Sequence, residues 1–310
     1  MNHVQQNNSQ EFPEASRQYK DRLFRLVFRK KEDLLSLYNA VNDTAYDNPD
    51  ALEVNTLDNV LYLSMKNDIS FLIGGTMNLY EHQSTYNPNM PIRGLMYLSK
   101  LYEKYIAKNE IDIYTDTPKM LPFPQYLVFY NGTRGEPDRK ILKLTDLFRY
   151  PSTERVPCLE CIAIMLNINY GHNQALMEKC RRLEEYAIFV NTVRQNFSSK
   201  VPLKEAISKA VAECRRKNIL KDLLTEQEAE VVHMLLETFD KELHEKTLRK
   251  EAFEDGYNEG EAKERATGIR NLITTLREVD FPREITLEKL KEKYGLSLEE
   301  AKSYLDKYWK

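Results

Sequence analysis

The sequence predicts an α/β protein, in which a mixed sheet with flanking helices is followed by an α-helical C-terminal region. Three observations lead to this prediction. Amphipathic helical patterns open the chain, alternating apolar runs surround Gly74-Gly75, and Glu- and Lys-rich helical patterns take over after Gly171. The first part reads as helix, three strands, helix and two strands, which is an order typical of a mixed sheet covered by helices.

The elements of the first part follow from local patterns. A Gly-Gly pair between alternating runs indicates a tight hairpin turn, because such turns need positive φ angles. Pro91 suits the first turn of a helix. The segments DTAYDNPD, DTPKMLPFP and NGTRGEPDRK read as loops. Helices are predicted over 16–29, 31–41 and 92–107, and strands over 52–59, 66–73, 76–84, 125–132 and 161–171.

The second part is predicted to be helical over 173–196, 203–217 and 225–265. The last segment, from Ile285, reads as a helical hairpin. Gly295 ends its first helix, and Ser297 with Glu300 forms a capping box for the second. A packing or oligomerisation module is the favoured interpretation, and a DNA-reading helix-turn-helix is the alternative.

Composition limits the classes of function. The 310 residues are 42% hydrophobic and 30% charged, with a net charge of −3. Neither part is basic, so any polyanion must be bound by a local patch. The polar N-terminus is unlike a signal peptide, and no apolar run approaches the length of a membrane span, so a cytoplasmic location is expected.

The four cysteines include a CxxC pair, Cys158 and Cys161. Cys180 and His172 could complete a zinc site, but no second CxxC or HxxxH supports one. Reduced, partly buried thiols are the favoured interpretation.

The hairpin carries two acids, Asp68 and Glu81. With Gly74-Gly75 as the turn, Asp68 lies opposite Glu81, and Gln83 shares the face of Glu81. Facing carboxylates need neutralisation, and a divalent cation such as Mg²⁺ or Mn²⁺ would supply it. The alternative is an exposed sheet face on which the acids are simply solvated.

Side chains nearby suit phosphate chemistry. Gln83 can orient a water by accepting and donating hydrogen bonds. Lys66, expected opposite Gln83, is either a cation for developing negative charge or an ordinary edge lysine. On the next helix a basic face carries Arg93, Tyr97, Lys100 and Lys104. Arg93 is the best candidate there for contact with a phosphate, and Lys100 and Lys104 are better explained as solvated.

These residues together resemble a known family. The pattern D-x(n)-E-x-Q followed by R-x-x-x-Y is similar to the PD-(D/E)XK nuclease superfamily. More narrowly, YKDRLFRLVF, MKNDISFLI, YEHQSTYNPNMPIRGLMY, VFYNG and NINYGHN resemble the Rpn family of recombination-promoting nucleases, which are often labelled as transposases. The resemblance covers 19–197, and the stretch from EHQ to RGLMY is its most specific part.

The resemblance implies metal-dependent DNA cleavage by a core of the restriction-endonuclease type. Asp68 and Glu81 match the metal-binding acids, and Gln83 stands where the wider superfamily usually has Lys. Arg93 and Tyr97 match the signature of the following helix. A first-helix acid is often added to this site; Asp21 is its nearest match, and Glu53 competes. The implied divisions are a nuclease-like core over 1–170, a helical extension over 171–265 and a C-terminal hairpin over 266–310.

Three functions therefore compete. The first is a Mg²⁺-dependent DNA endonuclease that promotes recombination. The second is a non-catalytic DNA-binding or assembly protein that keeps the nuclease fold, as Gln83 in place of Lys would allow. The third is a helical scaffold with an incidental hairpin. Self-association through the helical C-terminal region is compatible with each.

Overall fold

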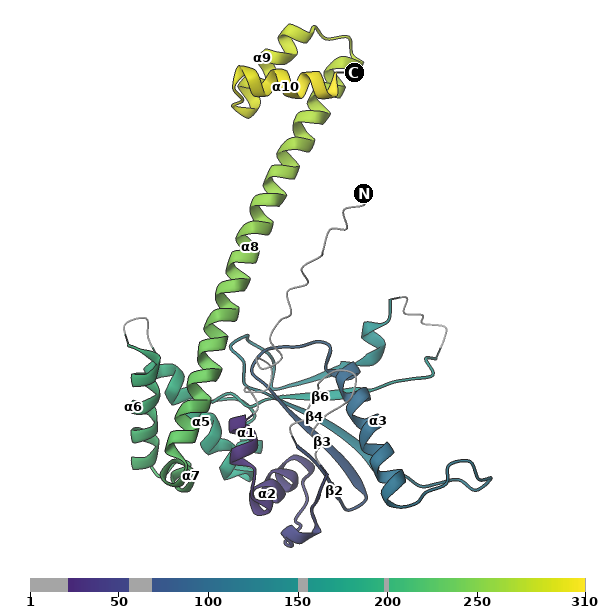
Figure 1. Cartoon of the computed structure of the whole chain (residues 1–310), viewed down its shortest axis with the longest axis vertical. Helices are drawn as coiled ribbons and strands as arrows, with labels where there is room; N and C mark the ends of the chain where they lie inside the picture. Colours follow the sequence, from purple (N-terminus) through teal and green to yellow (C-terminus); the bar gives the residue numbers. More distant parts are fainter. Residues whose placement is uncertain (1–21, 56–68, 150–155, 198–200, 310) are drawn as a thin grey trace, which may run out of the picture. The chain divides into compact units, whose positions relative to one another are not determined.

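The computed structural model describes residues 22–55, 69–149, 156–197 and 201–309 (Figure 1). The chain divides into two compact units, Met1–Asp240 and Lys241–Lys310. The division falls inside one long helix, and the divisions expected after residues 170 and 265 remain a sequence-based prediction.

A mixed six-stranded sheet is the centre of the first unit, as the sequence predicts. Its strand order is β1-β2-β3-β4-β6-β5. Strands β3, β4 and β6 are parallel, whereas β1, β2 and β5 pair antiparallel with their neighbours. The strands are β1 (Glu53–Val54), β2 (Ile69–Ile73), β3 (Thr76–Gln83), β4 (Phe123–Tyr130), β5 (Arg139–Lys143) and β6 (Ile162–Asn167).

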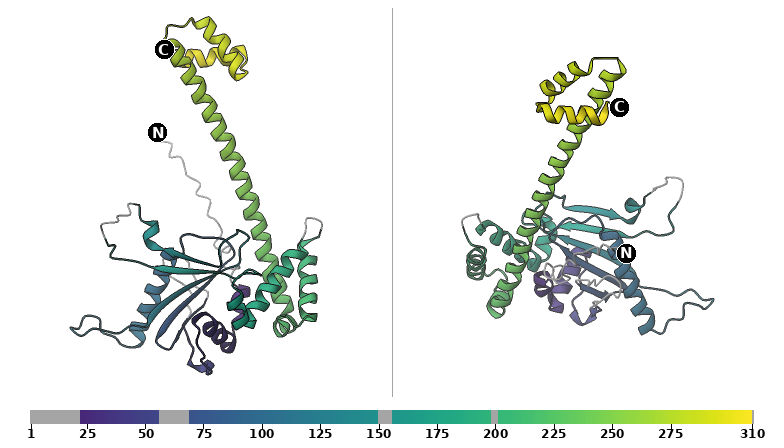
Figure 2. Two further views of the ribbon diagram at one scale, coloured as in Figure 1. Left: turned by 180° about the vertical axis from the view of Figure 1, so that it is seen from behind. Right: turned by 45° about the horizontal axis from the view of Figure 1, so that its top comes forward.

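Helices cover both faces of this sheet (Figures 1 and 2). Helix α3 (Met90–Lys108) packs on one face, where Met77 and Leu79 of β3 meet Tyr97 and Leu101 of the helix. The opposite face, which includes Tyr80, packs against α1 (Arg22–Val27), α2 (Lys31–Asn42) and α5 (Arg181–Asn196). Alternate residues of β3 therefore enter two separate hydrophobic clusters.

The helical part of the first unit joins the larger of these clusters. Buried side chains reach it from α5, from α6 (Leu203–Arg216) and α7 (Lys221–Glu226), and from the start of α8 (Glu228–Glu278). The predicted helix over 173–196 is two helices that meet at Cys180, whose φ is −129°. The bounds are α4 (Gln174–Lys179), α6 (Leu203–Arg216), α7 (Lys221–Glu226) and α8 (Glu228–Glu278), with short 3-10 helices η2 (Pro49–Ala51) and η3 (Leu144–Leu147).

The second unit contains the C-terminal part of α8, α9 (Arg283–Tyr294) and α10 (Leu298–Tyr308). Its core includes Ile269, Leu290 and Leu305. The predicted stop at Gly295 is confirmed by its φ of 60°, and both hydrogen bonds of the Ser297–Glu300 capping box are present.

Two expectations need correction. Arg139 and Lys140, assigned to a loop, begin the edge strand β5. The strand expected over 161–171 ends at Asn167. Among the described helices, none is both long and apolar enough to cross a bilayer.

Candidate functional site

The hairpin of β2 and β3 has the predicted turn and register. Gly74 and Gly75 have φ angles of 54° and 76°, as a two-residue primed turn requires. Ile73 lies opposite Thr76, and Ile69 lies opposite Tyr80. Asp68 and Lys66 precede β2 and lie outside the described residues, as does Asp21.

Glu81 is buried, so the alternative of a solvated acid does not apply to it. Its side chain is only 1% exposed, and its Oε2 lies 2.8 Å from Nη2 of Arg93 on α3. A carboxylate can occupy such a place only when a partner compensates the loss of water. The Arg93 guanidinium is such a partner in this structure.

Tyr97 completes this group of side chains. Nη2 of Arg93 also donates to the Tyr97 hydroxyl at 3.3 Å, and Tyr97 itself is fully buried. Burial by itself would lower the pKa of Arg93, but the charge of Glu81 raises it above its ordinary value. Tyr97 was placed with Arg93 on a helix face that could meet a phosphate backbone; here it is buried, and its hydroxyl accepts from Arg93.

Gly94 explains how α3 comes this close to the sheet. A Cβ atom at Gly94 would lie 2.2 Å from Cε1 of Tyr126 on β4. The missing side chain leaves room for the Tyr126 ring, which packs beneath the helix turn that carries Arg93. Burial, followed by the charge of Glu81, raises the pKa of Tyr126 well above its ordinary value.

The remaining predicted residues have different surroundings. Gln83 ends β3 two residues after Glu81, on the same face, and is half-buried. Glu53, the competitor of Asp21, pairs with Lys108 in the last turn of α3. Lys108 is 15 residues beyond Arg93, or about 22 Å along a helix. Glu53 therefore does not join Glu81.

The ligands for a divalent cation are incomplete in the described part of the chain. There, no group of three or more His, Cys, Asp or Glu side chains could hold a metal ion. Glu81 offers one carboxylate and Gln83 one amide oxygen on this face, whereas Mg²⁺ favours about six oxygen ligands including water. A metal here needs a further carboxylate, and Asp68 is the predicted one.

A second charged cluster on this face escaped the sequence prediction. Buried Glu136 lies 2.9 Å from Arg134 Nε and 2.8 Å from Lys140 Nζ. Both cations also lie over the ring of Tyr86, at 4.6 and 4.3 Å from its centroid. One row of paired residues crosses the sheet from β3 to β5: Glu81, Val128, Met165 and Lys140.

This row puts Lys140 three strand spacings from Glu81, or about 14 Å. The Arg134 side chain is 65% exposed and that of Lys140 is 33% exposed. The cluster carries two positive charges against one carboxylate. The cluster is therefore a local basic patch, which a chain that is not basic overall would need in order to bind a polyanion. The sequence analysis missed it because NGTRGEPDRK was assigned to a loop.

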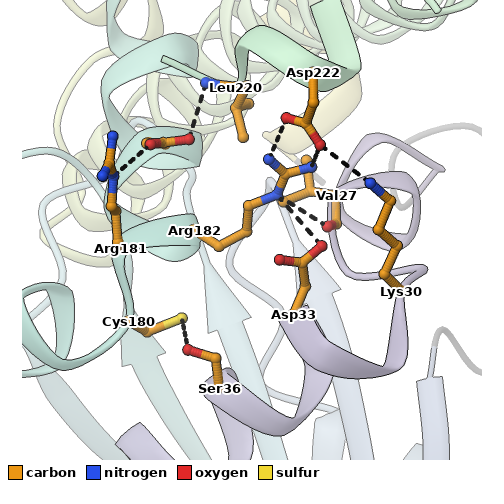
Figure 3. A network of polar contacts seen from close by, with 10 residues as sticks. Val27, Lys30, Asp33, Ser36, Cys180, Arg181, Arg182, Leu220 and Asp222 are labelled. Carbon is orange, nitrogen blue, oxygen red and sulfur yellow. Dashed lines mark hydrogen bonds and ion pairs between the residues drawn. The ribbon is translucent and has the colours of Figure 1, made fainter. Parts of the chain in front are cut away.

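An ion network elsewhere in the first unit links α2, α5 and α7 (Figure 3). Arg182 donates to both carboxylate oxygens of Asp222, at 2.7 and 3.2 Å, and lies 3.7 Å from Asp33. Burial would raise the pKa of Asp222, but Arg182 lowers it to about 2. The network joins helices to each other, and among the described residues it contacts none of those predicted for the site.

Within the part of the chain that the structure describes, the cysteines and His172 are not gathered into a group that could hold zinc. All four are free thiols, and Cys161, Cys180 and Cys214 are buried. Burial raises the pKa of Cys161 to about 11, so its thiol is protonated at neutral pH. The expectation of reduced, partly buried thiols agrees with this arrangement.

Comparison of the chain with protein-family models, with curated proteins and with solved structures finds no match.

Proposed function

We propose that this chain is a metal-dependent DNA endonuclease that hydrolyses phosphodiester bonds and promotes recombination, built on a PD-(D/E)XK-type core. The observation that carries the proposal is the buried Glu81 on the second strand of a hairpin whose register is known. A buried carboxylate held by a paired cation at a sheet surface is a frequent feature of functional sites. The resemblance to the Rpn family assigns this position to a metal ligand.

Asp68 supplies the second acid in this proposal. The register of β2 and β3 pairs Ile69 with Tyr80. If it continued one step further, as the sequence predicts, Asp68 would lie opposite Glu81. Asp68 and Glu81 would then hold Mg²⁺ or Mn²⁺, which polarises phosphoryl oxygens and lowers the pKa of a bound water. Asp21 is the candidate for a third acid.

The chain's own residues have separate parts in this scheme. Gln83 orients the attacking water through its amide, since it cannot act as a base. Arg93 neutralises Glu81 when no metal ion is bound. When a metal ion binds the Glu81 carboxylate, Arg93 can donate to phosphate oxygens instead. Arg134 and Lys140 contact the backbone of the DNA, and Lys66 is a further candidate for this role.

Plasmid cleavage tests the proposal. Purified chain is incubated with supercoiled DNA and Mg²⁺ or Mn²⁺, with and without EDTA, beside Asp68→Ala and Glu81→Gln. We expect cleavage that requires metal and is lost in both variants. The matched control is Glu53→Gln, which removes an exposed acid on the neighbouring strand β1 and should cleave normally. Full activity of folded Asp68→Ala would refute the assignment.

A second function, DNA binding or assembly without catalysis, is favoured by one specific observation. Arg93 already supplies the positive charge that Glu81 needs, and Gln83 stands in place of a cationic Lys. This function predicts a gel shift without cleavage under either metal. It also predicts that Arg134→Ala with Lys140→Ala weakens the shift, while Glu81→Gln leaves it unchanged.

A further inference from the structure

The second unit begins with a long stretch of α8 that is surrounded by solvent. Every described side chain from Thr247 to Arg265 is exposed, and the buried core of this unit starts only at Ile269. A helix in water is stabilised mainly by the packing of one face, since helix formation by itself is marginal. Gly256 and Gly260 weaken this stretch further, because glycine disfavours the helix. A second surface packed on it would therefore stabilise it.

Two large aromatic side chains stand on this stretch. Phe253 is 73% exposed, and Tyr257 is 64% exposed. They are four residues apart, so they lie on the same face of the helix, about one turn from each other. Gly260 follows three residues later on this face, where a Cβ atom would meet nothing within 4 Å. The face thus offers two rings next to a position at which another backbone can approach closely.

The net charge of α8 changes sign beside these rings. Residues 241–250 contain four Lys or Arg and two Glu, which gives a net charge of +2 with His244 neutral. Residues 251–260 contain four Asp or Glu and no Lys or Arg, which gives −4. Lys250 and Glu254 pair across the boundary at 3.6 Å. Pairs within one helix reach about four residues, so most of the charge of each segment faces solvent.

We propose that this stretch of α8 pairs antiparallel with the same stretch of a second copy of the chain. Residues 241–250 of each copy then lie beside residues 251–260 of the other, so the charges of +2 and −4 face each other twice. A parallel pair in register would place like charges side by side. A different protein would need the same two charges in the reverse order, which a second copy already provides.

The aromatic face fits the same arrangement. If the two-fold axis passes between residues 250 and 251, the Phe253 positions of the two copies are about 8 Å apart along the helices. Rings at that spacing can reach each other, since aromatic pairs have centroids about 4.5–7 Å apart. Tyr257 follows one turn farther from the axis on the same side. The rings therefore form an apolar centre, and the opposite charges determine the direction of pairing.

The mass of the full chain in solution tests this pairing. Sedimentation equilibrium over a series of protein concentrations should show a dimer that dissociates on dilution. Because opposite charges face each other across the contact, the dissociation constant should rise with salt concentration. A chain that stays monomeric at every concentration at which it is soluble would overturn the proposal.

Two variants locate the contact. We expect Phe253→Ala and Tyr257→Ala each to raise the dissociation constant about tenfold or more, as for aromatic side chains at the centre of an interface. Alanine favours the helix, so a loss of pairing would not arise from a loss of helix, which circular dichroism checks. The matched controls are Phe123→Ala, 71% exposed, and Tyr170→Ala, 61% exposed, which should leave the dissociation constant unchanged.

A distance between two spin labels determines the direction of pairing. Ala262 is exposed and lies half a turn around the helix from Phe253, away from the proposed contact. The label is attached to Ala262→Cys in a Cys158→Ser background, because Cys158 is an exposed thiol. Antiparallel pairing separates the two labels by about 23 residues, or about 35 Å along the helices. Parallel pairing would leave them apart by the width of the pair, about 20 Å.

The outcomes separate this pairing from the proposed cleavage, because none of its residues belongs to the proposed site. A dimer with distant labels that both ring variants weaken supports the pairing, even if the chain cuts no DNA. A dimer that both ring variants leave intact would overturn it, since another surface would then hold the copies together. Labels no farther apart than the width of the pair would overturn the antiparallel direction, even if cleavage is strong.

Discussion

Neighbouring residues of β3 face two differently built environments. Glu81 faces α3, where it forms a buried ion pair with Arg93, supported by Tyr97. His82 faces the other way, where its ring stacks on Phe24 at 5.2 Å and its Nε2 meets the Tyr186 hydroxyl. One face depends on opposite charges, and the other depends on hydrogen bonds between groups that can all be neutral.

This difference indicates how each face can respond to a ligand. A buried carboxylate and its cation are each costly when separated, so a new ligand at Glu81 must replace the role of Arg93. On the other face, Nδ2 of Asn131 donates to the Tyr186 hydroxyl, which also meets Nε2 of His82, so no pair of opposite charges has to be separated there. The α3 face therefore suits an exchange of charged partners, whereas the face that packs on α5 does not depend on such a pair.

Removal of Arg93 should give the largest loss of stability. Arg93→Met removes the guanidinium that pairs with the buried Glu81 carboxylate, and breaking a buried pair in this way costs about 3–5 kcal/mol in the free energy of unfolding. The double variant Glu81→Gln/Arg93→Met should recover most of that loss. Urea denaturation of wild type, both single variants and the double variant gives the coupling energy.

The exposed pair of Glu53 and Lys108 is the control for this cycle. Lys108→Met should cost less than about 1 kcal/mol, as for other surface ion pairs. Equal stability of Arg93→Met and the double variant would contradict the contrast between the faces, since the Glu81 carboxylate would then tolerate the loss of its Arg93 partner.

Gly94→Ala should have the next largest effect on stability. It tests whether the close approach of α3 to the sheet, which brings Arg93 to Glu81, depends on the missing side chain at this position. The new Cβ would lie 2.2 Å from the Tyr126 ring, so α3 must move away from the sheet. We expect a loss of about 2–3 kcal/mol, in the upper range for overpacking. Gly256→Ala is the control, because a Cβ there meets nothing within 4 Å and Ala favours the helix. Equal changes in the free energy of unfolding for the two variants would show that Gly94 is not needed for the packing of α3.

The sequence predicted the hairpin better than it predicted what surrounds it. Gly74-Gly75 and the alternation of β2 and β3 are local signals, and together they determine which residues face each other. The partner of Glu81 is not local, because it depends on how closely α3 approaches the sheet. That distance is set by the contact of Gly94 with Tyr126, which no periodicity reveals.

The missed features have the same cause. Strand β5 is an edge strand with three exposed residues of five, so RKILK lacks the apolar run of the central strands. Hydrogen bonds from Arg194 join Asn131 and Asn169, so this cluster gathers residues from three separate segments. The motifs VFYNG and NINYGHN marked two of those segments, but the residue from α5 had no signal in the sequence.

Loss of the Tyr186 hydroxyl should cost less than loss of a charge. Tyr186→Phe deprives Asn131 Nδ2 and His82 Nε2 of a neutral partner, so we expect a loss of about 1.5 kcal/mol in the free energy of unfolding. Tyr170→Phe, at an exposed position, should stay within about 0.5 kcal/mol of wild type. A loss for Tyr186→Phe as large as that for Arg93→Met would mean that the α5 face also depends on charge.

The smallest expected effect on stability concerns the ion pair of Arg182 and Asp222, which links helices and does not contact either face of the sheet at β3. In the network of Figure 3, Arg182 lowers the pKa of Asp222 from 3.8 to about 2. A lowered carboxyl pKa stabilises the folded state above the unfolded value, and this contribution disappears as pH falls from about 4 to 2. Asp222→Asn should therefore be less stable than wild type at neutral pH, and the difference should vanish in that acidic range.

Solvent limits the size of this effect, since the Asp222 side chain is 40% exposed. We expect at most about 1 kcal/mol at neutral pH, measured by urea denaturation at a series of pH values. Exposure thus separates Asp222 from Glu81, although both carboxylates meet an arginine at 2.7–2.8 Å. If Asp222→Asn lost as much free energy of unfolding as Arg93→Met, the distance between the charges, rather than their burial, would set the strength of these pairs. The ion pair at the α3 face would then be no stronger than an exposed one.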